Sequence, residues 1–557
     1  METNHPASTP DVSKISADQC VVEPAFGLGR FAPFNWERLP HSTGIRLFWG
    51  RIVLWLLVLV CVGWTVVASG LFVFVKYRRG FSEVQYSHMI LLPWKLDAYR
   101  RAKGEFLIKQ GLAKAEAQEW RAAFDLLRPG LLAVPDHREA RLLTARIYLM
   151  AGRPDMARTL LIEGIKYHGD QLGYLREALG FFFGLQADEA VIELTRELRS
   201  RLDPKTPVAR LAVTALAYGY FNRERLAEAE AVFAEAHLLG TPEARFVAAR
   251  IAWERGQRAE AVAQLRELVV QVEGESEAYR TLITYLREDQ RWAEVRRASL
   301  QRQFALPEQP EAYVDFIAAC AKEGDEVRAA EAETAFFERF GHDAPALVKL
   351  AEAAATAGRI ELVRRVVARC RELGQDEPDA GLLLLAAYLE ARDYRGLLED
   401  GAGLGRASAR WSERHRLMAD GLRAVALYGT GQEVEASILN QRLMDSRLLP
   451  AAALISVARQ LNVAGRRMEA RRLAEHARTL DPLYQPAWVF SLECMFAQQD
   501  LGEAPALIER LLGMRKPPVE LLRSLAQALE SDQYLFMPDR VKAQEQIAGW
   551  VQERKRP

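Results

Sequence analysis

A period of about 34 residues runs through most of this chain and restricts what it can fold into. Twelve positions that are mostly small carry the period, and they are Ala123, Ala157, Ala190, Ala229, Ala261, Val295, Ala329, Val363, Leu397, Ala436, Ala470 and Ala504. Nine of the twelve are alanine, and seven of the eleven intervals between them have the same length. Such a period is typical of repeat arrays, in which each unit packs against its neighbours.

A second series lies twelve residues before the first. It consists of Gly111, Ala145, Ala178, Ala217, Ala249, Ile283, Ile317, Ala351, Leu385, Ala424, Ala458 and Leu492. Eight of these are Gly or Ala, which lets two antiparallel helices approach closely. Glycine-containing stretches such as "AGRPD" (151–155) and "RGQ" (255–257) fall between the two series. Because glycine accepts the left-handed backbone that ends a helix, each unit is predicted to be helix–turn–helix.

Composition agrees with an all-α protein. Beyond residue 100, Ala and Leu dominate with Arg and Glu between them, and unbranched side chains lose little rotamer freedom in a helix. Lys plus Arg and Asp plus Glu both number 74 in the 557 residues, so the formal net charge is zero. Nucleic-acid binding normally needs a basic excess, so this balance argues against that class of partner.

Once the two series are aligned, residues 104–537 resemble the tetratricopeptide repeat family. The first repeat, "FLIKQGLAKAEAQEWRAAFDLLRPGLLAVPDH", matches the family at five positions, which are occupied by Gly111, Trp120, Ala123, Leu127 and Pro135. The second unit does the same with Ala145, Tyr148, Gly152, Ala157 and Leu161. Middle units depart from the pattern at Ile283, Ile317 and Leu385. The resemblance implies an α-solenoid of about twelve helix pairs that works in protein–protein interaction.

Two intervals, Ala190 to Ala229 and Leu397 to Ala436, are longer than the others and interrupt the period. They contain "SRLDPKTPVAR" (200–210) and "GAGLGRASARWSERHR" (401–416), which are predicted to form longer loops between repeats. We therefore expect three blocks of repeats, 104–205, 206–405 and 406–537. The charged segment 538–557 is predicted to be a helix that caps the last repeat, because a solenoid needs a polar end.

One uncharged stretch precedes the repeats. Ile52–Val75 contains 24 residues without a charge, and at 1.5 Å per residue it would extend about 36 Å. A secretory signal begins earlier and is shorter, and a core helix of this length would rarely lack every charge. A single transmembrane helix over 47–77 is therefore predicted. Within about 20 residues, three Lys or Arg lie on its amino side and four on its carboxyl side, which leaves the side of the repeats undetermined.

The segments around the membrane helix have weaker signals. Residues 1–46 are expected to be a flexible tail whose aromatic end lies at the membrane interface, binds a partner or is unstructured. Residues 78–103 are expected to be a juxtamembrane connector. Within it, Met89–Leu96 is too short to span a membrane and is expected to pack on the first repeat or lie near the headgroups.

A search for chemistry finds no catalytic, cofactor-binding or metal-ligating residue to nominate. "GAGLG" (401–405) lacks both a preceding strand and the Lys-Ser/Thr of a phosphate loop, so it is expected to be a loop between repeats. The five cysteines contain no CxxC, and Cys370 and Cys494 are expected in the core. His137, His168 and His476 are interpreted as surface residues, and the acidic "QADEAVIEL" (186–194) as a solvated helix face.

The aromatic residues mostly coincide with the packing positions. Core packing is therefore expected for Trp120, Tyr148, Tyr220, Trp292, Tyr388 and Tyr394. The cluster "GFFFGL" (180–185) contains more aromatic surface than one helix pair buries. It is expected in the core, with an exposed binding patch as the alternative.

The leading functional hypothesis is a non-catalytic, single-pass membrane scaffold of bacterial type. Its partner would be a protein or peptide held in the concave groove of the solenoid, with no small-molecule substrate. The alternative is an adaptor in envelope assembly, lipopolysaccharide regulation or protein quality control that recruits an enzyme or protease. Relatives of that kind carry a carboxyl-terminal module with paired cysteines, which this chain lacks. A third class, an enzyme with a catalytic domain fused to the repeats, would need roughly 100 residues outside the repeats and the membrane segment, and this sequence leaves too few.

Overall fold

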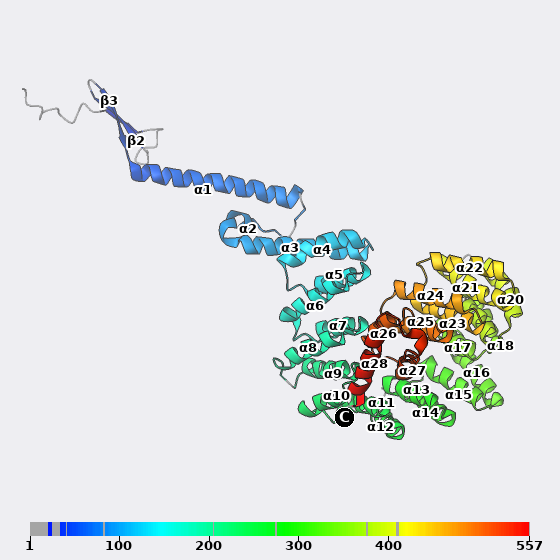
Figure 1. Cartoon of the computed structure of the whole chain (residues 1–557). Coiled ribbons are helices and arrows are strands. Elements are labelled where there is room, and N and C mark those ends of the chain that lie inside the picture. Colours follow the sequence, from blue (N-terminus) through cyan, green and yellow to red (C-terminus); the bar gives the residue numbers. More distant parts are fainter. Residues whose placement is uncertain are drawn as a thin grey trace, which may run out of the picture. The chain divides into compact units, whose positions relative to one another are not determined.

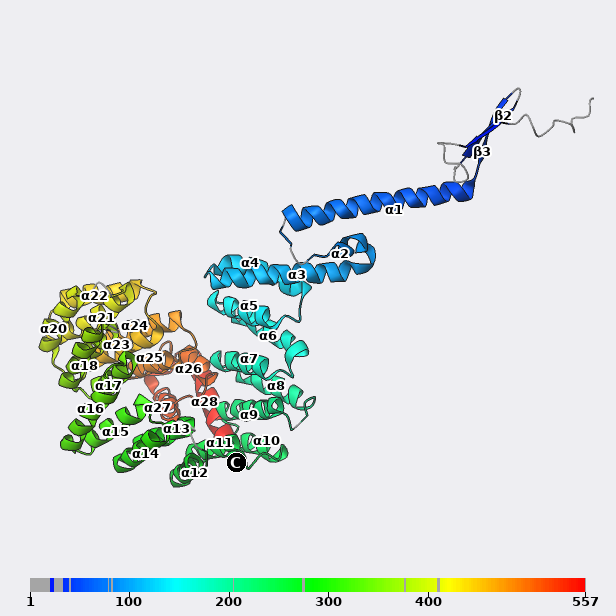
Figure 2. The ribbon, with the colours of Figure 1, turned by 180° about the vertical axis from the view of Figure 1, so that it is seen from behind.

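The computed structural model describes residues 21–24, 34–39, 42–78, 80–81, 84–203, 205–272, 276–374, 377–407 and 411–555. The chain divides into two compact units, Met1–Gly169 and Asp170–Pro557. Helices dominate both units, as the two opposite views in Figures 1 and 2 show. The predicted all-α class is therefore correct for nearly all of the described chain.

The exception to the helical class lies before the long apolar helix. Strands β1 (Val21–Pro24), β2 (Phe34–Leu39) and β3 (Ser42–Leu47) form an antiparallel sheet in the order β1-β2-β3. In the β2–β3 hairpin Trp36 lies opposite Ile45. This part of the sequence was expected to be a flexible tail, and its described residues instead have regular strand pairing. Residues 1–20, 25–33 and 40–41 of that expectation lie outside the described residues.

Helix α1 (Trp49–Val73) continues into a short π-helix, η4 (Phe74–Arg78). Together they form the one helix, among the residues described, that is long and apolar enough to cross a membrane. Its large side chains are mostly exposed, and Ala68 is the only α1 residue that the structure buries.

A short helix lies along the carboxyl-terminal half of α1. In α2 (Tyr86–Ile90), the Ile90 carbonyl accepts a hydrogen bond from Trp64 Nε1 at 2.7 Å, and the Tyr86 hydroxyl lies 2.8 Å from Ser69 Oγ. Met89 is buried in a small cluster that also contains Phe106 of α3. The segment 89–96 therefore begins between α1 and the first helix of the repeats.

Helices α3 to α26 form twelve successive pairs, and the two helices of each pair contact each other. The first helices are α3 (Leu92–Glu116), α5 (Arg138–Met150), α7 (Leu172–Gly184), α9 (Pro207–Asn222), α11 (Pro242–Glu254), α13 (Ser276–Glu288), α15 (Pro310–Lys322), α17 (Ala344–Thr356), α19 (Glu377–Glu390), α21 (Glu413–Gly429), α23 (Ala451–Val463) and α25 (Gln485–Gln498). The second helices are α4 (Trp120–Ala133), α6 (Pro154–His168), α8 (Asp188–Arg199), α10 (Leu226–Glu235), α12 (Arg258–Gln271), α14 (Trp292–Ala305), α16 (Glu326–Phe340), α18 (Ile360–Leu373), α20 (Tyr394–Ala407), α22 (Glu433–Asp445), α24 (Arg467–Leu480) and α26 (Ala504–Leu512). The prediction of about twelve pairs is confirmed.

Both periodic series lie in the core. The twelve positions of the second helices are all 7% exposed or less, and those of the first helices are equally buried. At Gly111 a Cβ atom would lie 2.7 Å from the Leu127 side chain, so only glycine allows this pair to approach so closely. Close helix packing is thus the reason for the small residues.

Every turn within a pair contains one residue with positive φ. Six of these residues are glycine, namely Gly152, Gly256, Gly324, Gly358, Gly431 and Gly465. The other six are Gln118, Gln186, Glu224, Gln290, Arg392 and Gln499. The left-handed turn is therefore a property of the repeat geometry, and glycine is its most favourable occupant rather than a requirement.

The second of the two longer intervals differs from its prediction. The "GAGLG" stretch lies within α20, which continues to Ala407, so it is helical and not a loop. Buried Leu404 and Gly401 show why, since this part of α20 packs against its neighbours.

The chain ends in α27 (Val519–Ala528), the 3-10 turn η5 (Asp532–Tyr534) and α28 (Arg540–Lys555). Ala543 and Ile547 of α28 enter one hydrophobic cluster with Leu507 and Leu511 of α26.

Candidate binding surface of the second unit

The first helices line the inner surface of the second unit. First helices contact each other along much of the array, as α15 does with α17, α17 with α19 and α19 with α21, although α13 makes no extensive contact with α11 or α15. Second helices make far less extensive contacts of this kind. Because elements are closer together on the inside of a curve, the first helices lie on the concave side. The concave side is also the surface on which the sequence predicts a protein or peptide partner.

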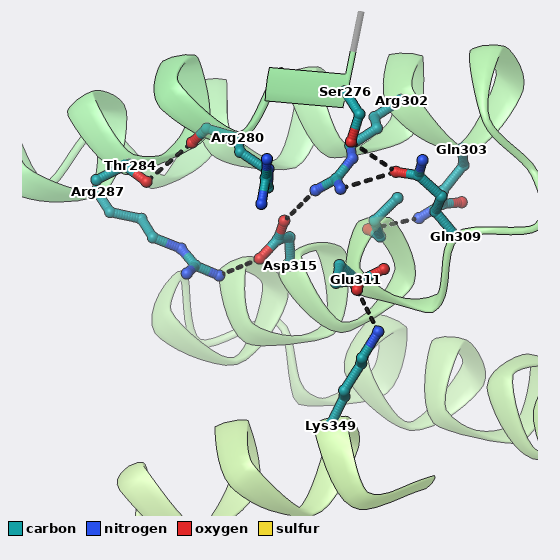
Figure 3. Close-up of polar contacts among 11 residues, drawn as sticks. Ser276, Arg280, Thr284, Arg287, Arg302, Gln303, Gln309, Glu311, Asp315 and Lys349 are labelled. Carbon is teal, nitrogen blue, oxygen red and sulfur yellow. Dashed lines mark hydrogen bonds and ion pairs between the residues drawn. The ribbon is translucent and has the colours of Figure 1, made fainter. Parts of the chain in front are cut away.

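A group of charged side chains comes together on the first helices α13, α15 and α17 and near the end of the second helix α14 (Figure 3). This inner basic cluster consists of Arg280, Arg287, Arg302, Glu311, Asp315 and Lys349. Arg302 Nη1 lies 3.3 Å from Asp315 Oδ2, and Arg287 pairs with the other oxygen of the same carboxylate. Lys349 pairs with Glu311. The four cationic side chains exceed the two carboxylates by two charges.

Arg280 is the cation of the inner basic cluster that is available to a ligand. It is exposed, and it forms no ion pair with any residue that the structure describes. Its guanidinium lies on the same side as those of Arg287 and Arg302 (Figure 3). The cluster therefore offers net positive charge at the concave surface, where an acidic group of a partner would be attracted.

Burial shapes the rest of the inner basic cluster. Arg302 is 2% exposed, and its Nη2 donates to Gln309 Oε1 at 2.9 Å. Burial lowers the pKa of Arg302, against the opposing pull of Asp315. Burial likewise raises the pKa of Asp315, although Arg287 and Arg302 favour its charged form. These buried groups fix one another in place and leave Arg280 at the surface.

A cavity of about 440 Å³ lies next to the inner basic cluster. Its floor is formed by small and aliphatic side chains of α15 and α17, including Ile317, Ala318, Ala321 and Ala353. Arg287 belongs both to this inner cavity and to the cluster. The surface therefore combines an apolar recess with an adjacent positive charge, an arrangement suited to a peptide with an apolar and an acidic side chain.

The two ends of the second unit meet through a buried ion pair. Arg515, in the loop between α26 and α27, donates to both oxygens of Asp188 at 2.7 Å and to the Phe183 carbonyl at 3.0 Å. Asp188 is 2% exposed and also accepts from Asn222 at 2.9 Å. The array within this unit therefore curves until its last repeats reach its first.

Further polar contacts surround this closing ion pair. Lys516 pairs with Glu254, and its ammonium lies 4.2 Å from the centre of the Phe221 ring. Gln186 donates to the Leu483 carbonyl at 2.9 Å. Burial lowers the pKa of Lys516, and Glu254 opposes this shift. These polar contacts make up most of the junction between the two ends. In the part of the chain that the structure describes, no helix of α7–α11 makes extensive contacts with α25–α28.

These contacts correct the interpretation of two sequence stretches. Asp188 was read as part of a solvated helix face, but it is buried because Arg515 covers it. In "GFFFGL", Phe182 is fully buried as expected, whereas Phe183 is partly buried and contacts Arg515 through its carbonyl and its ring. No local sequence signal predicts a pair separated by 327 residues.

The remaining aromatic residues divide between the core and the edges of cavities. Tyr220 and Tyr388 are buried, which confirms core packing for these two. Trp120, Tyr148 and Trp292 are only half-buried and each lines a cavity. Tyr394 is also half-buried, and its ring packs against Gly429. Core packing therefore holds in full for only part of this set.

In the part of the chain that the structure describes, histidine and cysteine form no reactive cluster. Among the described residues, no three His, Cys, Asp or Glu side chains converge as metal ligands. His137 caps α5 by accepting from Ala140, but His168 is buried, which corrects its interpretation as a surface residue. Cys370 and Cys494 are buried as predicted, and burial raises the pKa of Cys494 to about 11, so its thiol stays protonated at neutral pH.

Comparison with known proteins gives a likeness at low similarity. No protein-family model matches the chain, and no curated protein matches its sequence. Among solved structures, yeast Tom70 matches 88% of this chain and 99% of its own at 13% identity and a TM-score of 0.38. Naa15/Naa10 bound to HypK-THB matches at 14% identity, covering 89% and 80% of the two chains with a TM-score of 0.27. The APC/C hetero-tetramer Cut9-Hcn1 matches at 10% identity, covering 81% and 96% with a TM-score of 0.26. The chain is similar to these helical-repeat structures, and at these scores the likeness carries no inference about function.

Proposed function

We propose that this chain is a single-pass membrane protein whose repeats hold a protein partner on the inner surface of the second unit, without catalysis. The observation that carries the proposal is the inner cavity beside the inner basic cluster, joined by Arg287. An apolar side chain of the partner would enter the cavity. A carboxylate of the same segment would meet exposed Arg280.

The membrane part of the proposal rests on the surface of α1 and η4. Only 6% of the most apolar window of Trp49–Arg78 is buried, so among the described residues no protein core covers its Leu, Val and Trp side chains. Exposed apolar area costs about 25 cal/mol per Å² in water, and hydrocarbon removes that cost. Thirty helical residues extend about 45 Å, enough to cross a bilayer of about 30 Å with tilt.

Cys61 provides the test of the membrane anchor. It lies within α1 and its side chain is exposed. In lipid nanodiscs, and with Cys20→Ser to remove a second thiol, we expect Cys61 to resist a charged, water-soluble maleimide, because that reagent does not enter hydrocarbon. A cysteine introduced at the exposed position Arg158 of α6 (Arg158→Cys with Cys61→Ser) should react readily. Equal reaction of the two thiols would contradict a membrane-spanning α1. A reporter fused to the carboxyl terminus would then identify the side on which the repeats lie.

The partner test compares variants of the full-length chain in nanodiscs. Ala353→Trp fills the inner cavity, and Arg280→Glu reverses the available charge beside it. Arg297→Glu is the matched control, because Arg297 is exposed on a second helix and has the same charge change. Proteins captured from a membrane extract are identified by mass spectrometry.

We expect one protein to be captured by the wild type and by Arg297→Glu, and to be lost from Ala353→Trp and Arg280→Glu. Capture that is equal across all four proteins would show that the inner surface is not the binding site. If the captured protein is a protease or an envelope-synthesis enzyme, the scaffold acts as the recruiting adaptor considered above.

A further inference from the structure

The first unit contains a cavity of its own, of about 580 Å³. It lies between α4 and the junction of α5 with α6, and its apolar lining consists of Trp120, Phe124, Ile147, Tyr148, Met150 and Met156. Phe124 and Tyr148 pack edge to face with ring centres 5.1 Å apart, so this side of the cavity is lined by two aromatic rings that hold each other in place. We call this the first-unit cavity.

Two methionines at the first-unit cavity are exposed to solvent. Met150 is 60% exposed and Met156 is 45% exposed, although both are unbranched apolar side chains. Methionine is common on surfaces that adapt to an incoming apolar group, because its thioether is polarisable and its side chain is flexible. Trp120 and Tyr148 remain only half-buried at the same place. The cavity therefore has apolar surface that none of the described residues of the first unit covers.

The charged residues that line the first-unit cavity are all basic. Arg121, Arg128 and Arg153 line it, and no acidic residue does. Within the described chain none of the three forms an ion pair, whereas other cations of the same unit are paired, as Arg101 is with Asp136 at 2.7 Å and Lys114 with Glu119 at 2.8 Å. The apolar cavity therefore lies within a rim of three available positive charges.

We propose that the first-unit cavity is a second docking site, which takes a helical protein segment with one or two large apolar side chains flanked by Asp or Glu. The volume suits side chains of the size of Leu, Phe or Trp, and the arginine rim is complementary to carboxylates. A helix presents such residues on one face at spacings of three and four. The first-unit cavity is lined only by residues of the first unit, so it shares no residue with the binding surface proposed above for the second unit.

The test uses a defined probe with the full-length chain in phosphatidylcholine nanodiscs. The probe is a dye-labelled helical peptide of twelve residues with Leu and Trp four positions apart and Glu on either side. A second peptide has Lys in place of every Glu. Fluorescence anisotropy gives the Kd of each. We expect the Glu peptide to bind at least about tenfold more tightly than the Lys peptide, because charge pairs at the rim change sign.

Variants assign the binding to the first-unit cavity. The double variant Arg121→Glu with Arg153→Glu should raise the Kd of the Glu peptide at least about tenfold. It should also reduce the difference in Kd between the Glu and the Lys peptides. Met150→Lys should weaken both peptides by introducing a charge into the apolar lining. Arg158→Glu is the matched control, since Arg158 is exposed on α6 but does not line the cavity. Circular dichroism melts confirm that each variant is folded.

Three results would overturn the proposal. Equal binding of the Glu and Lys peptides would mean that the arginine rim does not select a partner. Loss of binding in Arg158→Glu to the same extent as in the double variant would mean a general charge effect. Displacement of the Glu peptide when phosphatidylglycerol replaces part of the phosphatidylcholine would identify an anionic lipid, rather than a protein segment, as the occupant.

Discussion

Removing Arg515 should open the second unit without unfolding it. Arg515 supplies two hydrogen bonds of 2.7 Å to Asp188 and one of 3.0 Å to the Phe183 carbonyl. All three join the last helices of the second unit to its first helix pair, α7 and α8. In Arg515→Ala these three bonds are lost. Asp188 regains water once the loop moves away, so the lost interaction appears as detachment of the loop and not as a permanently buried charge.

The magnitude follows from what remains after the substitution. A hydrogen bond to a charged group contributes about 1.5–3 kcal/mol, so the two bonds from Arg515 to Asp188 together contribute about 3 kcal/mol or more. The Lys516–Glu254 pair, with side chains 35% and 33% exposed, supplies about 0–1 kcal/mol. The stacking of Lys516 on Phe221 and the hydrogen bond of Gln186 each add about 1 kcal/mol. The Arg515 contribution is therefore the larger part of the closing free energy. A loss of about 3 kcal/mol shifts the ratio of closed to open chains more than 100-fold.

The assay is a distance measurement between the two ends of the second unit. Nitroxide labels on Glu193→Cys in α8 and Glu520→Cys in α27, in a background with Cys20→Ser and Cys61→Ser, are read by double electron–electron resonance. We expect a narrow distance distribution in the parent chain and a broad, longer one with Arg515→Ala.

The control for this measurement is Arg201→Ala, which removes an ion pair to Glu197 between side chains 65% and 61% exposed. This pair contributes little and does not join the two ends, so the narrow distribution should persist. A narrow distribution in Arg515→Ala as well would refute the reasoning that the Arg515–Asp188 pair holds the unit closed.

Further outcomes follow from the turns and the core. Gln290 has φ +57 and an exposed side chain, so Gln290→Gly should stabilise the chain by about 0.5–1 kcal/mol in urea unfolding, because glycine relieves the left-handed strain. Gly256→Ala, with φ +79 and no atom within 4 Å of the new Cβ, should destabilise it by about 1 kcal/mol, and no change in either variant would contradict the strain argument. Ala470→Leu adds volume where the residue is fully buried and should cost about 1–3 kcal/mol in the same assay. The pKa of Cys494 is raised to about 11, so its thiol should react with a disulfide reagent at pH 8 only after urea unfolds the chain, and immediate reaction would show that the site is open.

Local sequence was sufficient for the repeat itself. Each pair buries its small residues where its two helices pack together, so the interactions that define the repeat recur once in every repeat and leave a readable pattern. Ala123 and Ala470 are fully buried, as the pattern predicts, although they belong to units near opposite ends of the array. The long apolar helix was predictable from Ile52–Val75 for a different local reason, since its length and apolar composition are properties of one continuous stretch of sequence.

What the sequence could not determine depends on how small rotations between successive pairs accumulate. The curvature of the second unit brings Arg515 to Asp188 across 327 residues, and this contact buries an aspartate that its neighbours in sequence would leave in water. In the same way, Arg121 and Arg153 share one cavity only because α4 packs against α5, whose end leads into α6. The period of the chain thus determined its architecture, and the geometry of stacking determined which charges meet, are buried or stay available for a partner.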